Sequence, residues 1–476
     1  MKKIILRIIL ILIVFLFLWS GFNLLTDIKE PKFKAAGDID TSSVVAFLNE
    51  LFPPIPVDKE NGFYKLWTLA EPPDVDIESE KLLKMYKDLN DPKKTTEKSI
   101  KNWINSKSNP KNREFIKRLK KKRREILKKS DLWDNYSQYA NRDWGRSILK
   151  NREDVLKMEE LMKPLMERYE KALNIRYFDD YTLVVFKDNK INFAVVTVPD
   201  LLTWIHVAKQ YTAFNVLNAF EGNWIKSTEN IIKNMDFAKK ATKGSRTLIT
   251  NLVAKTILKI SIWGINSIMN RPDCPDEVFE LVLLRMPDIK YDEYGSRKPL
   301  QVEGFSTSQV KSIIPLFQNN RTKKYYYDHF SKIIKSDRTP PYKWESDPRE
   351  LENVKQGFFW WVQNPFGKFH YKKAALGNFA TVVLKSWHSK VLYDMTRISA
   401  ELHLKYDPLI SVQKNLDGLD SYRSLQDPCS GKPYIWHEKK QMLYSYGVDR
   451  DDDGGKDGPI QFWDADFFLS VILYVK

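Results

Sequence analysis

The residues of this sequence with the most specific chemical potential are aspartates near its C-terminal end. Asp449, Asp451 and Asp453 alternate with other residues, Gly454 follows them, and Asp457 comes shortly after. Alternating carboxylates followed by glycine form the first half of a calcium-binding loop, where the carboxylates converge on the ion and glycine permits a sharp turn. Because like charges this close repel one another, the stretch requires a cation, basic neighbours or full solvation.

The spacing departs from that of an EF-hand. Ile460 stands at the twelfth position, where an EF-hand has a bidentate glutamate, and Pro459 opposes the helix that would follow. Asp464 and Asp466 could complete the coordination sphere instead. The alternative to a calcium site is a solvated acidic turn beside a hairpin. The predicted ligands of a structural Ca²⁺ ion are Asp449, Asp451, Asp453, Asp457, Asp464 and Asp466.

A short β-hairpin is expected to position the acidic stretch. Tyr434–Trp436 and Met442–Ser445 are predicted strands, joined by a turn over Glu438–Lys440. A helix is predicted before them, from Phe379 to Tyr406, because its apolar residues recur at helical spacing. Together these elements define a predicted C-terminal α+β module over residues 377–476.

These segments resemble the C-terminal end of the major pseudopilin of type II secretion systems. The shared motifs lie in "DPCSGKPYIW", "LYSYGVDRDDDGG" and "DAD". In that family the loop binds calcium, so the resemblance implies Asp449, Asp464 and Asp466 as ligands, with backbone oxygens near Tyr446 and Val448. The chain lacks the N-terminal processing pattern of pilins, and the resemblance is confined to its last part, so a pilin subunit is not expected.

The whole chain is similar to a set of membrane-anchored bacterial envelope proteins without assigned activity. The shared stretches are "NGFYKLWTLAEPP" near the start, the "NAFEGNW" segment and the tail described above. This resemblance implies a location in the bacterial envelope and no particular reaction.

The N-terminal sequence predicts a transmembrane anchor over residues 1–26. Lys2, Lys3 and Arg7 precede an apolar run from Ile8 to Leu25, which is long enough to cross a hydrocarbon core of roughly 30 Å. Basic residues before the run favour a cytoplasmic N-terminus, so the rest of the chain is expected in the periplasm. A cleaved signal peptide is the alternative, although no A-x-A site follows the run.

The charge of the chain favours an anionic neighbour. Lys and Arg number 77 against 61 Asp and Glu, which gives a net charge of +16. The densest basic segment is Lys117–Lys129, within a Lys-rich helical region predicted over residues 27–180. It is either a solvated helix surface or a patch for anionic lipid, since a periplasmic location puts nucleic acid out of reach.

The middle of the chain, residues 181–376, is predicted to be a helical core domain that a β-hairpin opens at 181–198. An αα-hairpin follows, with its turn at Gly222-Asn223 and with Gly244 expected as the C′ residue of the second helix. The next helix, Thr247 to Asn270, is expected to be the most buried. Its polar residues recur too often for a second membrane span; they are Asn251, Lys255, Lys259 and Asn266. The predicted fold class is therefore mainly α.

No catalytic motif is visible. The sequence has no P-loop, G-x-G-x-x-G, G-x-S-x-G or H-E-x-x-H pattern, and Asp179-Asp180 resembles an exposed turn. Cys274 and Cys429 belong to no Cys/His cluster, so two unrelated thiols are favoured over a bridge. The sequence thus predicts a periplasmic scaffold or protein-interaction protein. An envelope hydrolase acting on cell-wall or surface polymer is the alternative, and a cytosolic nucleic-acid binder requires the reversed topology.

Overall fold

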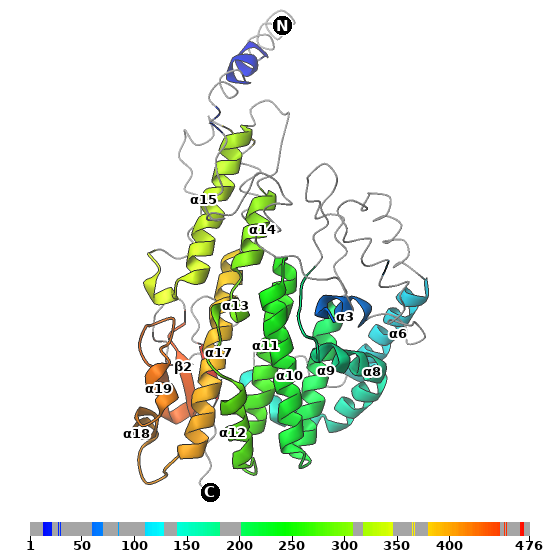
Figure 1. The fold of residues 1–476 in the computed structure, drawn as a ribbon, viewed down its shortest axis with the longest axis vertical. Helices are drawn as coiled ribbons and strands as arrows, with labels where there is room; N and C mark the ends of the chain where they lie inside the picture. The colour runs from blue at the N-terminus through cyan, green and yellow to red at the C-terminus, as the bar shows by residue number, and fades with distance from the viewer. Residues whose placement is uncertain are drawn as a thin grey trace, which may run out of the picture.

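The computed structural model describes most of the helical body of the chain. The described residues are 13–20, 27, 29, 60–69, 84, 110–127, 140–180, 201–307, 318–345, 364, 366, 379–447, 452, 454 and 467–470. Within them the protein is mainly helical, with a small antiparallel sheet near the C-terminus (Figure 1). The predicted hairpin at 181–198 lies outside these residues.

The helices of the body begin with four from residues 60–180. They are α3 (Gly62–Leu69), α6 (Pro110–Leu127), α7 (Ala140–Lys150) and α8 (Arg152–Leu173). The middle and C-terminal helices are α9 (Leu201–Phe220), α10 (Trp224–Gly244), α11 (Leu248–Met269), α12 (Asp276–Arg285), α13 (Tyr291–Tyr294), α14 (Arg297–Thr307), α15 (Asn319–Arg338), α17 (Phe379–Lys405), α18 (Val412–Asp417) and α19 (Asp420–Ser424).

Helix α11 runs through the middle of the body. It packs against α9, α10 and α17, and side chains on all its faces are buried. Thr247 caps its N-terminus by accepting the N–H of Thr250, and Asn270 ends it. Leu248–Met269 is long and apolar enough to cross a membrane by length and composition, and 72% of its apolar window is buried inside the protein. The predicted αα-hairpin is confirmed as α9 and α10.

The prediction for Gly244, at the end of α10, is wrong. Gly244 is the last helical residue rather than a C′ residue beyond the helix, and a Cβ there would lie 1.9 Å from the carbonyl oxygen of Phe178. The glycine is therefore required by a close backbone approach, and not by a left-handed conformation. The N–H of Asp180 donates to the Gly244 carbonyl at 3.1 Å, which holds the two segments together.

Asp179 and Asp180 are buried rather than exposed, which corrects the sequence prediction. The Arg246 guanidinium donates Nε to Asp179 Oδ1 at 3.0 Å and Nη2 to Oδ2 at 2.8 Å. Asp180 Oδ2 accepts the N–H groups of Arg246 and Thr247 at 3.2 and 3.3 Å, at the start of α11. Both carboxylates are satisfied where the chain enters the central helix, so they act as structural groups.

The C-terminal module follows helix α17. Its sheet has the order β1-β2-β3, with β1 (Ile435–His437), β2 (Met442–Ser445) and β3 (Phe467–Ser470). β1 and β2 pair antiparallel, with Trp436 opposite Leu443, and a 3₁₀ turn over Glu438–Lys440 joins them. The predicted long helix and this hairpin are confirmed.

One continuous cluster of buried apolar side chains extends from α3 to β2. It therefore includes residues from each of the three predicted regions that follow the anchor, 27–180, 181–376 and 377–476. Cys274 and Cys429 are both buried and free.

Candidate functional site

A buried lysine on α11 is the centre of the most polar part of the core. The side chain of Lys255 is almost completely buried. Its ammonium group donates to the Ser386 hydroxyl of α17 at 2.6 Å and to the Ser296 hydroxyl that precedes α14. A buried amine in apolar surroundings is costly unless it is hydrogen-bonded and its charge is balanced, so the surroundings of these two serines decide what the lysine does.

Asp337, near the end of α15, provides the opposite charge. It is fully buried, and its Oδ1 accepts the Ser386 hydroxyl at 2.8 Å. Its Oδ2 accepts the backbone N–H of Ser296 at 2.8 Å and the Tyr291 hydroxyl. Lys255 and Asp337 are therefore linked through Ser386, and we refer to Lys255, Ser386, Ser296, Asp337 and Tyr291 as the Lys255 cluster.

The hydrogen bonds of the Lys255 cluster have a consistent direction. Lys255 donates to both serines, Ser386 donates to Asp337, and Ser296 donates to Asn251 Oδ1 at 2.8 Å. This order fits a protonated lysine and an ionised aspartate bridged by hydroxyl groups. The cluster joins α11, α15, α17 and the segment before α14, which are far apart in the sequence.

The pKa of Lys255 lies close to neutral pH, so its charge depends on the conditions. Burial lowers the pKa of Lys255 to about 7, an effect that the Asp337 carboxylate opposes and Lys385 reinforces. Burial also raises the pKa of Tyr291, and the charge of Asp337 adds to that rise. Tyr291 therefore remains a hydrogen-bond donor at all physiological pH values.

This balance predicts a pH dependence of stability. The pKa of Lys255 is about 7 in the folded protein against 10.5 for an ordinary lysine, so between these values only the unfolded chain carries the proton and stability rises with pH. Below pH 7 both states carry it, and the cost of burying the charge is constant. From about pH 7 to about pH 9 the free energy of unfolding should rise by at most about 3 kcal/mol.

Denaturant unfolding at several pH values measures that slope. Lys255→Met has a similar volume and no titrating group, so its free energy of unfolding should lack the rise that the parent protein shows. Equal slopes for the two proteins in this pH window would contradict the assignment to Lys255.

Further basic groups lie beside the cluster, on α11 and α17. The Nζ atom of Lys259 is 3.5 Å from Nδ1 of His388. The same atom lies over the Trp263 ring, 4.8 Å from the ring centroid, in a cation–π contact. Burial, followed by the charges of Lys259 and Lys385, holds the pKa of His388 well below its usual range. The imidazole is therefore neutral near pH 7.

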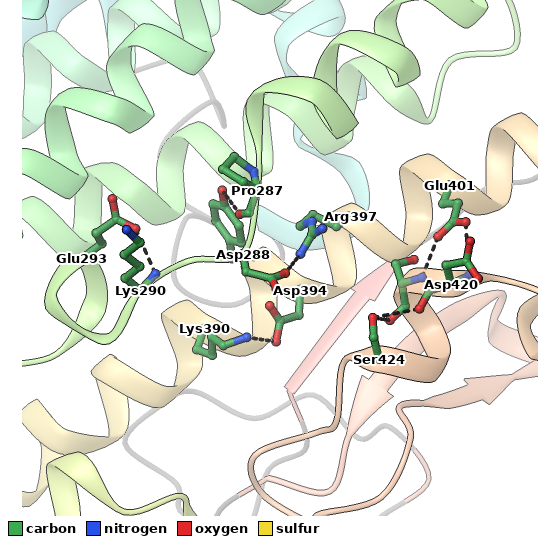
Figure 2. A network of polar contacts seen from close by, with 12 residues as sticks. Pro287, Asp288, Lys290, Glu293, Lys390, Asp394, Arg397, Glu401, Asp420 and Ser424 are labelled. Carbon is green, nitrogen blue, oxygen red and sulfur yellow. Dashed lines mark hydrogen bonds and ion pairs between the residues drawn. The ribbon is translucent and has the colours of Figure 1, made fainter.

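A second polar network lies nearer the C-terminal end of α17 and connects that helix to the α12–α13 connection and to the C-terminal module (Figure 2). Asp394 is fully buried, forms an ion pair with Lys390 and accepts the Tyr434 hydroxyl at 3.1 Å. One turn on, Arg397 pairs with Asp288. Burial raises the pKa of Asp394, although Lys390 and Tyr434 oppose that rise. These contacts fix the C-terminal module and the α12–α13 connection to the same helix.

Glu401 extends this network to α19. Its carboxylate accepts the N–H groups of Asp420 and Ser421 at 3.3 and 2.9 Å and pairs with Lys405. Burial alone would raise the pKa of Glu401, but these hydrogen bonds outweigh it and lower the pKa to about 2. Glu401 thus stays ionised and caps the start of α19.

The predicted calcium ligands Asp449, Asp451, Asp453, Asp457, Asp464 and Asp466 lie outside the described residues. Of the acidic stretch the structure describes Asp452, whose Oδ1 accepts the Tyr444 hydroxyl at 3.0 Å and the Gly454 N–H at 2.9 Å. Among the described residues no group of three His, Cys, Asp or Glu side chains could hold a metal ion.

Asp427, which opens the motif shared with the pseudopilin tail, is fully buried. Its Oδ1 accepts the Ser445 hydroxyl at 2.7 Å and the Cys429 N–H at 2.9 Å, and its Oδ2 accepts the Ser430 N–H at 3.2 Å. Its role is therefore to fasten the loop before β1 to the end of β2.

The Lys255 cluster was not predicted as a site. The available indication was the four-residue spacing of Asn251, Lys255 and Lys259 in an otherwise apolar helix, which puts polar groups on one face. The partners come from distant segments without any motif of their own. Comparison with protein-family models, with curated proteins and with solved structures finds no match to this chain.

Proposed function

We propose that the protein is a single-pass, membrane-anchored periplasmic scaffold whose helical body presents surfaces to other molecules. The observation that carries this proposal is the contact between Asp27 and α15. The N–H groups of Asn320 and Arg321 donate to the Asp27 carboxylate at 3.2 and 3.0 Å. Asp27 is the first residue after the predicted anchor, 1–26, so the end of the proposed anchor is joined to the first turn of a body helix.

The described part of the apolar run supports an anchor. Residues 13–20 are helical, and the apolar side chains from Ile13 to Leu18 are exposed, with Phe17 at 81%. Figure 1 shows this helix (blue) projecting beyond the end of the body. A helix with exposed apolar residues on every side is unstable in water and stable in hydrocarbon.

A reporter fusion tests the topology. Alkaline phosphatase joined after Lys476 should be active in bacteria, and green fluorescent protein joined there through the general secretion route should be dark, because the C-terminus is periplasmic. Replacing Lys2, Lys3 and Arg7 by glutamate should reduce phosphatase activity. If the green fluorescent protein fusion were fluorescent and the phosphatase fusion inactive, the periplasmic location would be contradicted.

A structural calcium ion in the acidic loop is part of this proposal. It is supported by the alternating carboxylates and by the confirmed hairpin on which the loop is carried. Titration calorimetry of the full-length chain should show calcium binding and a raised melting temperature, both lost in Asp449→Asn/Asp451→Asn. Glu277→Gln/Glu280→Gln, which neutralises two exposed carboxylates of α12, is the matched control. Unchanged heat and melting temperature with calcium would argue for a solvated turn.

An envelope hydrolase is the second candidate, because a Ser386 hydroxyl 2.6 Å from the Lys255 amine is the contact that a serine–lysine nucleophile uses. The burial of both residues and the donation from Ser386 to Asp337 support the structural role instead. A fluorophosphonate probe distinguishes the two. Labelling that is lost in Ser386→Ala would favour the hydrolase, and we expect no labelling of the parent chain.

A further inference from the structure

Helix α6 presents a strongly basic surface on the outside of the body. Phe115, Leu119 and Ile126 are half-buried against the core, and Arg123 is half-buried as well. The exposed cations are Lys117, Arg118, Lys120, Lys121, Lys122 and Arg124. We call these side chains the α6 basic face.

The basic side chains on and beside α6 are close enough to repel one another. Burial and the neighbouring Arg124 lower the pKa of Arg123 to about 10. Burial and Arg123 lower the pKa of Lys209, on α9, to about 8. Like charges held this close favour an anionic partner, because such a partner relieves the repulsion.

A hollow lined by aromatic rings, two carboxylates and one lysine lies on the C-terminal module, and we call it the acidic hollow. It has a volume of about 540 Å³, and among its lining residues are Trp436, His437, Glu438, Lys439, Tyr444 and Asp452. The Trp436 indole donates to Glu438 Oε2 at 2.7 Å, and the Tyr444 hydroxyl donates to Asp452 Oδ1. Each carboxylate is thus oriented by an aromatic donor. Such a combination of carboxylates and aromatic rings suits lysine and arginine side chains.

The two surfaces are on opposite flanks of the molecule. Figure 1 shows α6 (cyan) at the right of the body and the C-terminal sheet (red) at the left, while the N-terminal helix projects from the upper end. They are therefore too far apart to meet within one chain. In copies held in the same membrane by the same anchor, however, the basic flank of one copy can face the acidic flank of the next.

We propose that copies of this chain associate side by side in the membrane, with the α6 basic face of one copy docked on the acidic hollow of its neighbour. This inference rests on the proposed membrane-anchored scaffold and names its partner as a second copy. The contact is heterologous, so each copy keeps one free surface of each kind and association continues into rows or closed rings.

A second copy fits better than an anionic lipid surface. α6 lies at the side of the body and not at the end from which the anchor projects (Figure 1), so lipid headgroups are not its nearest neighbours. Lipid would also leave the acidic hollow without a cationic partner. One self-contact satisfies both surfaces of a chain whose net charge is otherwise strongly positive.

A charge exchange on the full-length chain tests the docking. Sedimentation in non-ionic detergent should show self-association at low salt that weakens at high salt. Lys117→Glu/Lys121→Glu/Arg124→Glu should weaken it about tenfold or more, and so should Glu438→Lys/Asp452→Lys. Each variant alone has two like-charged surfaces. Mixing the two should restore association, because each supplies the surface that the other needs.

Matched variants separate the contact from a general charge effect. Lys226→Glu/Lys290→Glu/Lys332→Glu makes the same change of charge at exposed lysines elsewhere, and should leave association within about twofold of the parent. Carbodiimide cross-linking in phosphatidylcholine vesicles should join α6 lysines to Glu438 or Asp452 of another copy. These cross-links should persist when phosphatidylglycerol is added.

Three results would overturn the proposal. The first is a parent protein that is monomeric at low salt, and the second is a mixture of the two charge-reversed variants that stays dissociated. The third is the loss of the cross-links when phosphatidylglycerol is added, which would assign the α6 basic face to lipid. The phosphatase fusion tests anchoring independently. A monomeric protein with an active fusion would therefore remove the self-association alone, whereas an inactive fusion would remove the common orientation on which it depends.

Discussion

Asp337→Ala is expected to destabilise the protein by about 3–5 kcal/mol at pH 6, where Lys255 is protonated. The substitution removes the only carboxylate of the Lys255 cluster and leaves a buried ammonium without its counter-charge. It also leaves the Tyr291 hydroxyl and the Ser296 N–H without the acceptor that the structure shows. Unfolding of the full-length chain in denaturant, followed by circular dichroism, measures the loss.

Removing both charges provides the control. Lys255→Met/Asp337→Ala should recover about half or more of the stability lost in Asp337→Ala, because no unpaired charge then remains in the core. The loss in Asp337→Ala should also shrink as the pH is raised above 7, since Lys255 can then shed its proton. A double variant less stable than Asp337→Ala would show that the two residues are not coupled in this way.

Gly244→Ala is expected to cost about 3 kcal/mol or more. Helix propensity alone predicts the opposite, since alanine inside a helix is about 1 kcal/mol better than glycine. The new Cβ would, however, lie 1.9 Å from the Phe178 carbonyl oxygen. This oxygen belongs to the backbone, so the clash cannot be relieved by a change of side-chain rotamer. The segment that carries Asp179 and Asp180 would have to move away from α10. Thermal and denaturant unfolding measure the outcome.

Gly222→Ala is the comparison for that substitution. Gly222 has a φ of +102°, and beyond its two chain neighbours nothing lies within 4 Å of the Cβ position, so alanine there meets only conformational strain, about 1–3 kcal/mol. We expect Gly244→Ala to be the more damaging of the two. If Gly244→Ala proved stabilising, the close approach of Phe178 would not be a feature of the protein in solution.

The sequence predicted the elements whose apolar spacing shows which face is buried. α9, α10, α11 and α17 were identified in this way, and so was the β1–β2 hairpin, because local periodicity carries that information. The start of α11 was predicted almost to the residue, since Thr247 is a strong capping residue.

The buried polar groups could not be predicted, because their partners are distant in sequence. Arg246 and Asp179 are 67 residues apart, and Lys255 and Ser386 are 131 apart. Asp179-Asp180 resembles an exposed turn until the guanidinium that neutralises Asp179 is in place. Gly244 was misinterpreted for the same reason, since the group that requires a glycine there belongs to Phe178 and not to the helix itself.

Helix α15 has a mechanical consequence for an anchored protein. Its first turn holds Asp27 and its last turn carries Asp337, so one helix of about 30 Å would connect the end of the proposed anchor to the Lys255 cluster. A force on the anchor would therefore act first on the two hydrogen bonds that the N–H groups of Asn320 and Arg321 donate to Asp27, at one end of α15. At the opposite end of α15, Asp337 is held inside the core by hydrogen bonds from Ser386, Ser296 and Tyr291. Under load, the contact with Asp27 should therefore break before the contacts of Asp337.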